Sequence, residues 1–155
     1  MPAILVVDDD PVVRQLLRTA LQLSNYEVEE AGDGLDGLHC CALRHFDLVI
    51  LDLIMPNKDG LQMISDLTLT NPSITILVVS GWIDDKLNLL EAAAKLGADD
   101  TLQKPFDVQV LLSKVETLLA GDRVVGDEGY RLKGERPKVG VRLSPRTSPM
   151  NKVLQ

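Results

Sequence analysis

Aromatic residues are scarce in this chain of 155 residues, since only 3% are Phe, Trp or Tyr. A hydrophobic core must therefore come from the aliphatic residues that dominate the 45% apolar content. No apolar run approaches the roughly 20 residues that a membrane-spanning helix needs. The N-terminus also lacks the positively charged start of a signal peptide. The two cysteines, Cys40 and Cys41, are adjacent and offer no disulfide framework. These absences favour a soluble, cytoplasmic protein.

Charge is distributed unevenly along the chain. Residues 1–120 contain 8 Lys and Arg against 19 Asp and Glu, whereas residues 121–155 contain 8 against 4. We expect an acidic globular domain over 1–120, followed over 121–155 by a Gly/Pro-rich, basic and mostly flexible extension. Weak alternation over residues 130–143 allows a hairpin, which would be marginally stable on its own. On electrostatic grounds the acidic domain is expected to be a poor nucleic-acid binder.

Strand and helix signals alternate five times along residues 1–120. Short apolar or alternating segments predict strands over residues 3–7, 26–30, 47–51, 74–79 and 99–103. Helical spacing and capping residues predict helices that follow Asp10, run over 33–45, 61–68 and 84–96, and follow Asp107. Short connections between alternating elements imply right-handed crossovers. The predicted fold class is α/β, a doubly wound, five-stranded parallel sheet with five helices.

Polar side chains directly follow four of the predicted strands. These strands lead into Asp8-Asp9-Asp10, Asp52, Ser80 and Lys104-Pro105. In an open parallel sheet, ligands bind outside the carboxyl ends of the strands, near the point where the strand order reverses. We therefore expect these groups to meet at one edge of the sheet. Carboxylates, a hydroxyl and an amine together suit a divalent cation and a phosphoryl group.

The segments around these residues resemble the receiver domains of bacterial two-component response regulators. The matching segments are Leu5-Val6-Val7-Asp8-Asp9-Asp10, Leu51-Asp52-Leu53-Ile54-Met55-Pro56 with Asp59-Gly60, Val79-Ser80-Gly81, and Gly97-Ala98-Asp99-Asp100 with Lys104-Pro105-Phe106. Their order and spacing cover residues 1–120. The resemblance implies the flavodoxin-like strand order 2-1-3-4-5. It also implies a phosphorelay signalling domain rather than an enzyme that acts on a separate substrate.

The resemblance assigns a metal site and its ligands. Asp9 would bind Mg²⁺ directly and Asp8 would bind it through water. The acceptor Asp52 and the backbone carbonyl of Ile54 would complete the protein ligands. Mg²⁺ prefers octahedral oxygen coordination with few protein ligands and several waters, which this set allows.

The resemblance also assigns the phosphoryl chemistry. Asp52 would accept the phosphoryl group from a histidine kinase or a histidine phosphotransfer protein. Ser80 would hydrogen-bond the phosphoryl group and Lys104 would pair with it, and the Lys104-Pro105 peptide would be cis. Signalling would then follow by contact with a downstream protein that the sequence does not identify.

Several residues depart from the family pattern or modify it. Thr101 stands three residues before Lys104, where the family usually carries Tyr or Phe. Thr101 is too short for the inward movement of an aromatic side chain, which places the standard output switch in doubt. Ile54 and Trp82 are large and apolar and stand two residues beyond Asp52 and Ser80. Neither can orient an attacking water, which favours slow autodephosphorylation.

We consider three alternatives to a single-domain response regulator. The chain could be an adaptor that binds its partner without phosphorylation, which partner-binding measurements would reveal. It could be the receiver portion of a longer regulator, because no output domain is recognisable after residue 120. An aspartyl-nucleophile hydrolase or phosphatase is disfavoured, because the sequence offers no insertion long enough to form a substrate cap.

Overall fold

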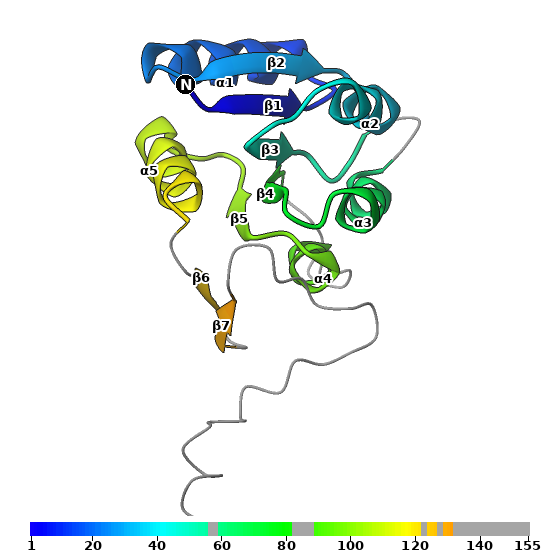
Figure 1. Cartoon of the computed structure of the whole chain (residues 1–155). Coiled ribbons are helices and arrows are strands. Elements are labelled where there is room, and N and C mark those ends of the chain that lie inside the picture. The colour runs from blue at the N-terminus through cyan, green and yellow to red at the C-terminus, as the bar shows by residue number, and fades with distance from the viewer. Residues whose placement is uncertain (56–58, 82–88, 122–123, 127–128, 132–155) are drawn as a thin grey trace, which may run out of the picture.

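Five parallel strands form one sheet in the order β2-β1-β3-β4-β5 (Figure 1). The computed structural model describes residues 1–55, 59–81, 89–121, 124–126 and 129–131. The strands of this sheet are β1 (Ala3–Val7), β2 (Glu27–Ala31), β3 (Leu48–Leu51), β4 (Thr75–Ser80) and β5 (Asp100–Gln103). The strand order therefore reverses between β1 and β3, as predicted.

Helices cover both faces of this sheet, which confirms the doubly wound α/β fold. They are α1 (Pro11–Leu23), α2 (Gly34–Leu43), α3 (Gly60–Thr70), α4 (Leu89–Leu96) and α5 (Val108–Leu119). Figure 1 shows α1 and α5 on one face, and α2, α3 and α4 on the other. Neighbouring helices on each face contact one another.

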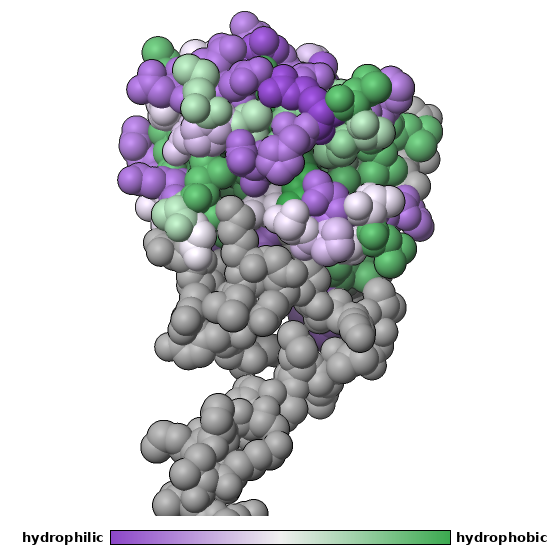
Figure 2. All heavy atoms as spheres, in the orientation of Figure 1, coloured by the Kyte–Doolittle hydropathy of each residue, from purple (hydrophilic) through white to green (hydrophobic). Residues whose placement is uncertain are grey.

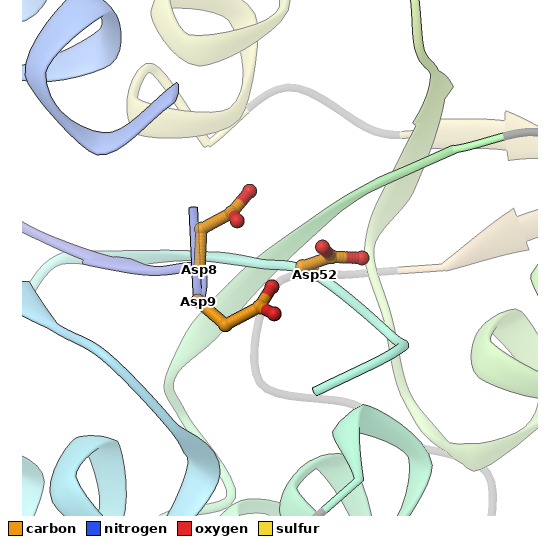
Figure 3. A group of neighbouring side chains, drawn as sticks. All are labelled: Asp8, Asp9 and Asp52. Carbon is orange, nitrogen blue, oxygen red and sulfur yellow. The ribbon is translucent and has the colours of Figure 1, made fainter. Parts of the chain in front are cut away.

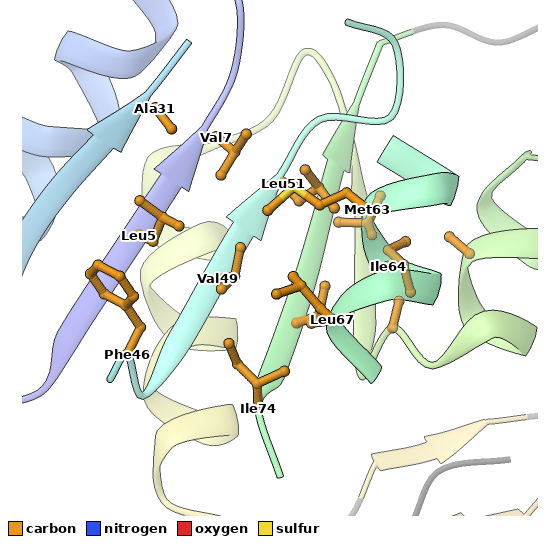
Figure 4. Close-up of a cluster of buried hydrophobic side chains, with 14 of the residues drawn as sticks. Leu5, Val7, Ala31, Phe46, Val49, Leu51, Met63, Ile64, Leu67 and Ile74 are labelled. Atoms are coloured by element: carbon orange, nitrogen blue, oxygen red, sulfur yellow. The ribbon is translucent and has the colours of Figure 1, made fainter. Parts of the chain in front are cut away.

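The hydrophobic core is divided into two clusters by the sheet, because successive strand residues point to opposite faces. Ile4 and Val6 of β1 pack with residues of α1 and α5. Leu5 and Val7 pack with residues of α3, including fully buried Met63 (Figure 4). Each central strand is buried on both faces, which is why its sequence reads as a continuous apolar run.

In the described part of the chain, an aspartate caps the N-terminus of four helices, α1, α2, α3 and α5. The carboxylates of Asp10, Asp33, Asp59 and Asp107 each accept a hydrogen bond from a backbone N–H group in the first turn. Pro11 occupies the first turn of α1, where no backbone donor is needed. In a parallel α/β fold, each helix starts near the carboxyl end of the preceding strand. The caps therefore fix the helix N-termini beside the edge where the polar strand ends are expected.

The predicted boundaries are close to the observed ones, with three instructive differences. Helix α2 ends at Leu43 rather than residue 45, because Arg44 is extended and places its guanidinium near Glu27 and Glu29 of β2. Strand β2 starts at Glu27, since the Tyr26 N–H still donates to the Leu21 carbonyl at the end of α1. Strand β4 includes Ser80 at its end. The first turn predicted for the helix over 84–96 lies outside the described residues.

A second, two-stranded antiparallel sheet follows the five-stranded one. Its strands are β6 (Val124–Gly126) and β7 (Gly129–Arg131). The hairpin predicted within residues 130–143 falls largely outside the described part of the chain. The pairing that is described begins earlier, at Val124. Among the described residues, no helix has the length and apolar character to cross a membrane.

Candidate functional site

The four polar strand ends meet at one edge of the sheet, as predicted. Backbone hydrogen bonds extend the ladder past the strands. The Asp8 N–H donates to the Ala31 carbonyl, the Asp52 N–H to the Val7 carbonyl, and the Lys104 N–H to the Ser80 carbonyl. Asp8, Asp52, Ser80 and Lys104 are thus placed by the strands themselves. The Lys104–Pro105 peptide is cis, as predicted.

Asp8, Asp9 and Asp52 form a carboxylate cluster. One oxygen from each lies within 4.8 Å of the others, and the three side chains surround a common space (Figure 3). Asp8 is 3% exposed and Asp52 is 8% exposed, whereas Asp9 lies at the surface. Buried like charges repel one another unless a cation joins them. Hard oxygen ligands in this arrangement fit a divalent cation such as Mg²⁺.

Lys104 supplies a positive charge inside this cluster. Its Nζ lies 2.7 Å from Asp8 Oδ2 and 3.2 Å from Asp52 Oδ2. Burial acts to lower the pKa of Lys104, but the hydrogen bond to Asp8 and the charges of both carboxylates outweigh it and raise the pKa above 10.5. Lys104 is therefore cationic at neutral pH and bridges two of the three candidate metal ligands.

Burial makes ionisation of Asp8 unfavourable. Burial raises its pKa above the ordinary 3.8, and this effect exceeds the lowering by the Lys104 hydrogen bond, the Asp10 N–H and the Lys104 charge. The Asp10 N–H donates to Asp8 Oδ1 at 2.9 Å. Both Asp8 oxygens therefore have partners, yet the ionised form remains disfavoured by loss of solvent. A divalent cation would relieve this cost.

Asp52 is surrounded by hydrogen-bond donors. The fully buried Ser80 hydroxyl donates to Asp52 Oδ1 at 3.1 Å. The Ile54 N–H approaches the same oxygen at 3.3 Å, and Lys104 contacts the other oxygen. This environment holds the carboxylate in one orientation at the edge of the sheet. A carboxylate fixed beside a cation and a hydroxyl can act as a nucleophile toward a phosphoryl group.

The remaining predicted residues lie around this centre. Ile54 is 59% exposed, and its backbone N–H reaches Asp52, while metal coordination by its carbonyl stays a prediction. Thr101 lies on β5 opposite Val78 and is partly exposed, and it is not part of the carboxylate cluster of Asp8, Asp9 and Asp52. Trp82 lies outside the described residues.

Arg14 is a residue at this site that the sequence interpretation missed. It lies on the first turns of α1, and its Nη1 donates to the backbone carbonyl of Asp8 at 2.7 Å. The sequence feature that could have indicated this contact is the position of Arg14, four residues after the cap Asp10 and next to apolar residues of the helix that face the core. A charged residue there is ordinarily read as part of the solvated helix face.

The chain is similar in sequence to response regulators. The response regulator receiver domain model matches residues 4–116. The response regulator MprA of Mycobacterium sp. (strain KMS) is 41% identical over 126 residues, which cover 81% of this chain and 53% of that protein. The DNA-binding dual master transcriptional regulator RpaA of Synechocystis is 36% identical over 123 residues, covering 77% of this chain and 49% of that one. The chain thus spans about half the length of these curated relatives.

The chain is also similar to the solved structure of a response regulator. The response regulator protein TrrA of Thermotoga maritima, in complex with Mg²⁺ and BeF, is 32% identical with a TM-score of 0.68. The match covers 76% of this chain and 99% of that one.

Proposed function

The chain belongs to the response regulator receiver domain family, and we propose that its Asp52 is the residue that accepts the phosphoryl group. The donor would be a histidine kinase or a histidine phosphotransfer protein. The observation that carries this proposal is the position of the Asp52 carboxylate. It lies between the Ser80 hydroxyl and the Lys104 ammonium, beside Asp8 and Asp9.

The transfer moves one phosphoryl group between two proteins. An Asp52 carboxylate oxygen forms a bond to phosphorus, while the bond from phosphorus to the donor histidine nitrogen breaks. The nitrogen keeps the electron pair of that bond. Charge neutralisation and in-line positioning dominate the barrier of such a reaction. Lys104 is placed to pair with a phosphoryl oxygen and Ser80 to donate a hydrogen bond to another.

Mg²⁺ is the cofactor that this donor set fits. Asp8, Asp9 and Asp52 would hold it, with the Ile54 carbonyl as the further ligand that the family resemblance implies. When bound, it supplies positive charge that offsets the carboxylates and the phosphoryl oxygens. The structure of TrrA with Mg²⁺ and BeF supports this choice by similarity.

Residues 1–120 would be the signalling unit. They would catalyse their own phosphorylation and lose the phosphoryl group slowly, because the apolar Ile54 beside Asp52 cannot orient a water. The output would be contact with a downstream protein. The basic extension over 121–155 would not contribute to the chemistry. The expectation that the acidic domain does not bind nucleic acid stays a prediction, since RpaA is described as DNA-binding.

A second candidate is the receiver portion of a longer regulator. The observation that favours it is length, because the chain spans about half of the curated relatives it matches. The phosphorylation chemistry would be the same in both cases. The open reading frame that encodes the chain distinguishes them.

The proposed acceptor is tested by labelling with radioactive acetyl phosphate and Mg²⁺. Wild-type protein should acquire hydroxylamine-labile phosphate, and Asp52→Asn should not, because an amide is not a competent nucleophile. Asp10→Asn is the matched control, since it removes a carboxylate near the site but preserves a good helix cap. Undiminished labelling of Asp52→Asn would overturn the assignment.

A further inference from the structure

We infer that Arg14 is a positioning residue for the candidate metal ligand Asp9, an inference that rests on the metal-dependent function proposed above. The Arg14 guanidinium donates to the Asp8 carbonyl at 2.7 Å. This carbonyl belongs to the peptide that joins Asp8 to Asp9. A peptide unit is planar, so fixing its oxygen also fixes the direction in which the Asp9 backbone leaves it.

Asp9 depends on its backbone for its placement. Its side chain is exposed, and within the described part of the chain its carboxylate makes no hydrogen bond or ion pair. Even so, one of its oxygens lies within 4.8 Å of oxygens of Asp8 and Asp52 (Figure 3). Asp8 and Asp52 are held by burial and by Lys104, whereas Asp9 has neither restraint.

Arg14 is itself held on its other side. Its Nε lies 3.5 Å from Glu30 Oε1, and Arg18, one turn further along α1, pairs with the second oxygen of Glu30. The Arg14 side chain is 21% exposed and that of Glu30 is 26% exposed, so the contact is shielded from solvent. A guanidinium presents several donors in a rigid fork. Arg14 therefore links β2 to the carbonyl at the end of β1.

Gly32 lies beside the Arg14 guanidinium. A Cβ atom at Gly32 would lie 3.6 Å from Arg14 Nη1, in ordinary contact. The guanidinium thus also lies against the loop that follows β2. Glu30 stands opposite Val6 in the pairing of β1 with β2. Three segments, the start of α1, the end of β2 and the end of β1, are joined through one side chain.

The consequence is a specific effect on metal affinity. Removing a group that orients a metal ligand typically weakens metal binding by about 10-fold to 100-fold. Arg14→Met should therefore weaken Mg²⁺ binding by about 10-fold. Arg18→Met is the matched control, because it removes the same charge from the same helix and also breaks a contact with Glu30, but has no contact with the Asp8 carbonyl. Arg and Met have similar helix propensities.

The test is isothermal titration of each full-length variant with MgCl₂, with thermal unfolding measured in metal-free buffer. The inference predicts a much larger loss of Mg²⁺ affinity for Arg14→Met than for Arg18→Met. It also predicts that Arg14→Met has little further effect in an Asp9→Asn background, because the charged ligand that Arg14 positions is then replaced by a neutral and much weaker one. A purely structural role would lower stability without this dependence on Asp9. Arg14→Gln, which is too short to span both contacts, should reproduce the loss if Arg14→Met does not fold.

The outcomes separate this inference from the proposed function. Equal Mg²⁺ affinities for the Arg14 and Arg18 variants, with normal wild-type binding, overturn the role of Arg14 alone. An undiminished Arg14 effect in the Asp9→Asn background overturns the route through Asp9. Wild-type protein that binds no Mg²⁺ contradicts the proposed function itself.

Discussion

Asp8 is a buried carboxylate whose ionisation works against folding in the absence of metal. Burial raises its pKa above 3.8, so the folded state binds a proton at Asp8 more tightly than the unfolded state does. The contribution of Asp8 to stability is therefore fully present below pH 3.8 and is lost as the pH rises through the folded pKa. At neutral pH the ionised side chain carries a net cost.

This cost predicts that Asp8→Asn is more stable than wild type at pH 7 in metal-free buffer. The difference should shrink as the pH falls toward 3.8, where the wild-type carboxyl becomes neutral. Thermal unfolding of both proteins across this pH range, with a chelator present, measures it. A variant that is less stable than wild type at pH 7 would show that the contacts with Lys104 and Asp10 outweigh desolvation.

Lys104 contacts both Asp8 and Asp52, so it would compete with a metal bound to these carboxylates. Lys104→Met should lower the free energy of unfolding in metal-free buffer by about 1.5–3 kcal/mol, the usual contribution of hydrogen bonds to charged groups. Saturating Mg²⁺ should then raise the melting temperature of the variant more than that of wild type. Lys114→Met is the control, because its 2.8 Å ion pair with Asp100 lies outside the cluster. A smaller Mg²⁺ shift in Lys104→Met than in wild type would refute the competition.

At the scale of secondary structure, α3 starts directly against the backbone of Asp52, the proposed acceptor. A Cβ atom at Gly60 would lie 2.4 Å from the Asp52 carbonyl oxygen and 2.5 Å from Leu53 Cα. The Gly60 N–H also donates to the Leu53 carbonyl at 2.8 Å. The segment that carries Asp52 and Ile54 is thus folded back against the start of α3, and backbone atoms cannot move aside as a flexible side chain can.

Gly60→Ala should therefore lower the free energy of unfolding by about 2 kcal/mol or more, as other overpacked sites do. Gly81→Ala is the control, since a Cβ there meets nothing within 4 Å. It should change stability by less than about 1 kcal/mol. Chemical denaturation of both variants measures the difference, and equal stabilities would contradict the close approach.

Strand β5 carries Thr101 where the family usually has an aromatic residue. A modification shifts a conformational equilibrium only through interactions that differ between the two states. Losing the aromatic movement removes one such difference. We predict that beryllofluoride and Mg²⁺ change backbone amide shifts around residues 52–60 and 80–86 more than along 99–119. Comparable NMR changes along 99–119 would show that the chain carries the signal by another route.

Sequence alone predicted the strands, their order by resemblance, and the edge where Asp8, Asp52, Ser80 and Lys104 meet. It could do so because buried parallel strands read as apolar runs and end at polar residues. It could not predict that Lys104 lies closer to Asp8 than to Asp52, at 2.7 Å against 3.2 Å. Contacts of this kind depend on side-chain packing between distant segments. Arg14 was missed for the same reason.

At the scale of the whole molecule, acidic residues are in excess over residues 1–120 and basic residues over 121–155. The surface over α1 and β2 is largely hydrophilic (Figure 2), and its ion pairs include Arg18–Glu30 and Arg44–Glu27. The residues of the candidate site, from Asp8 to Lys104, all lie within the acidic part of the chain. The excess of basic residues lies in 121–155. All the residues to which the proposed chemistry is assigned lie in the five-stranded domain.

The central claim is that the phosphoryl group is carried by Asp52, and chemical trapping tests it most directly. Borohydride reduces an aspartyl phosphate to homoserine, which peptide mass spectrometry then locates. After treatment with acetyl phosphate and Mg²⁺, the account predicts homoserine at position 52 and none at positions 8, 9 or 10. Homoserine at another aspartate, or none anywhere in a folded protein that binds Mg²⁺, would contradict it.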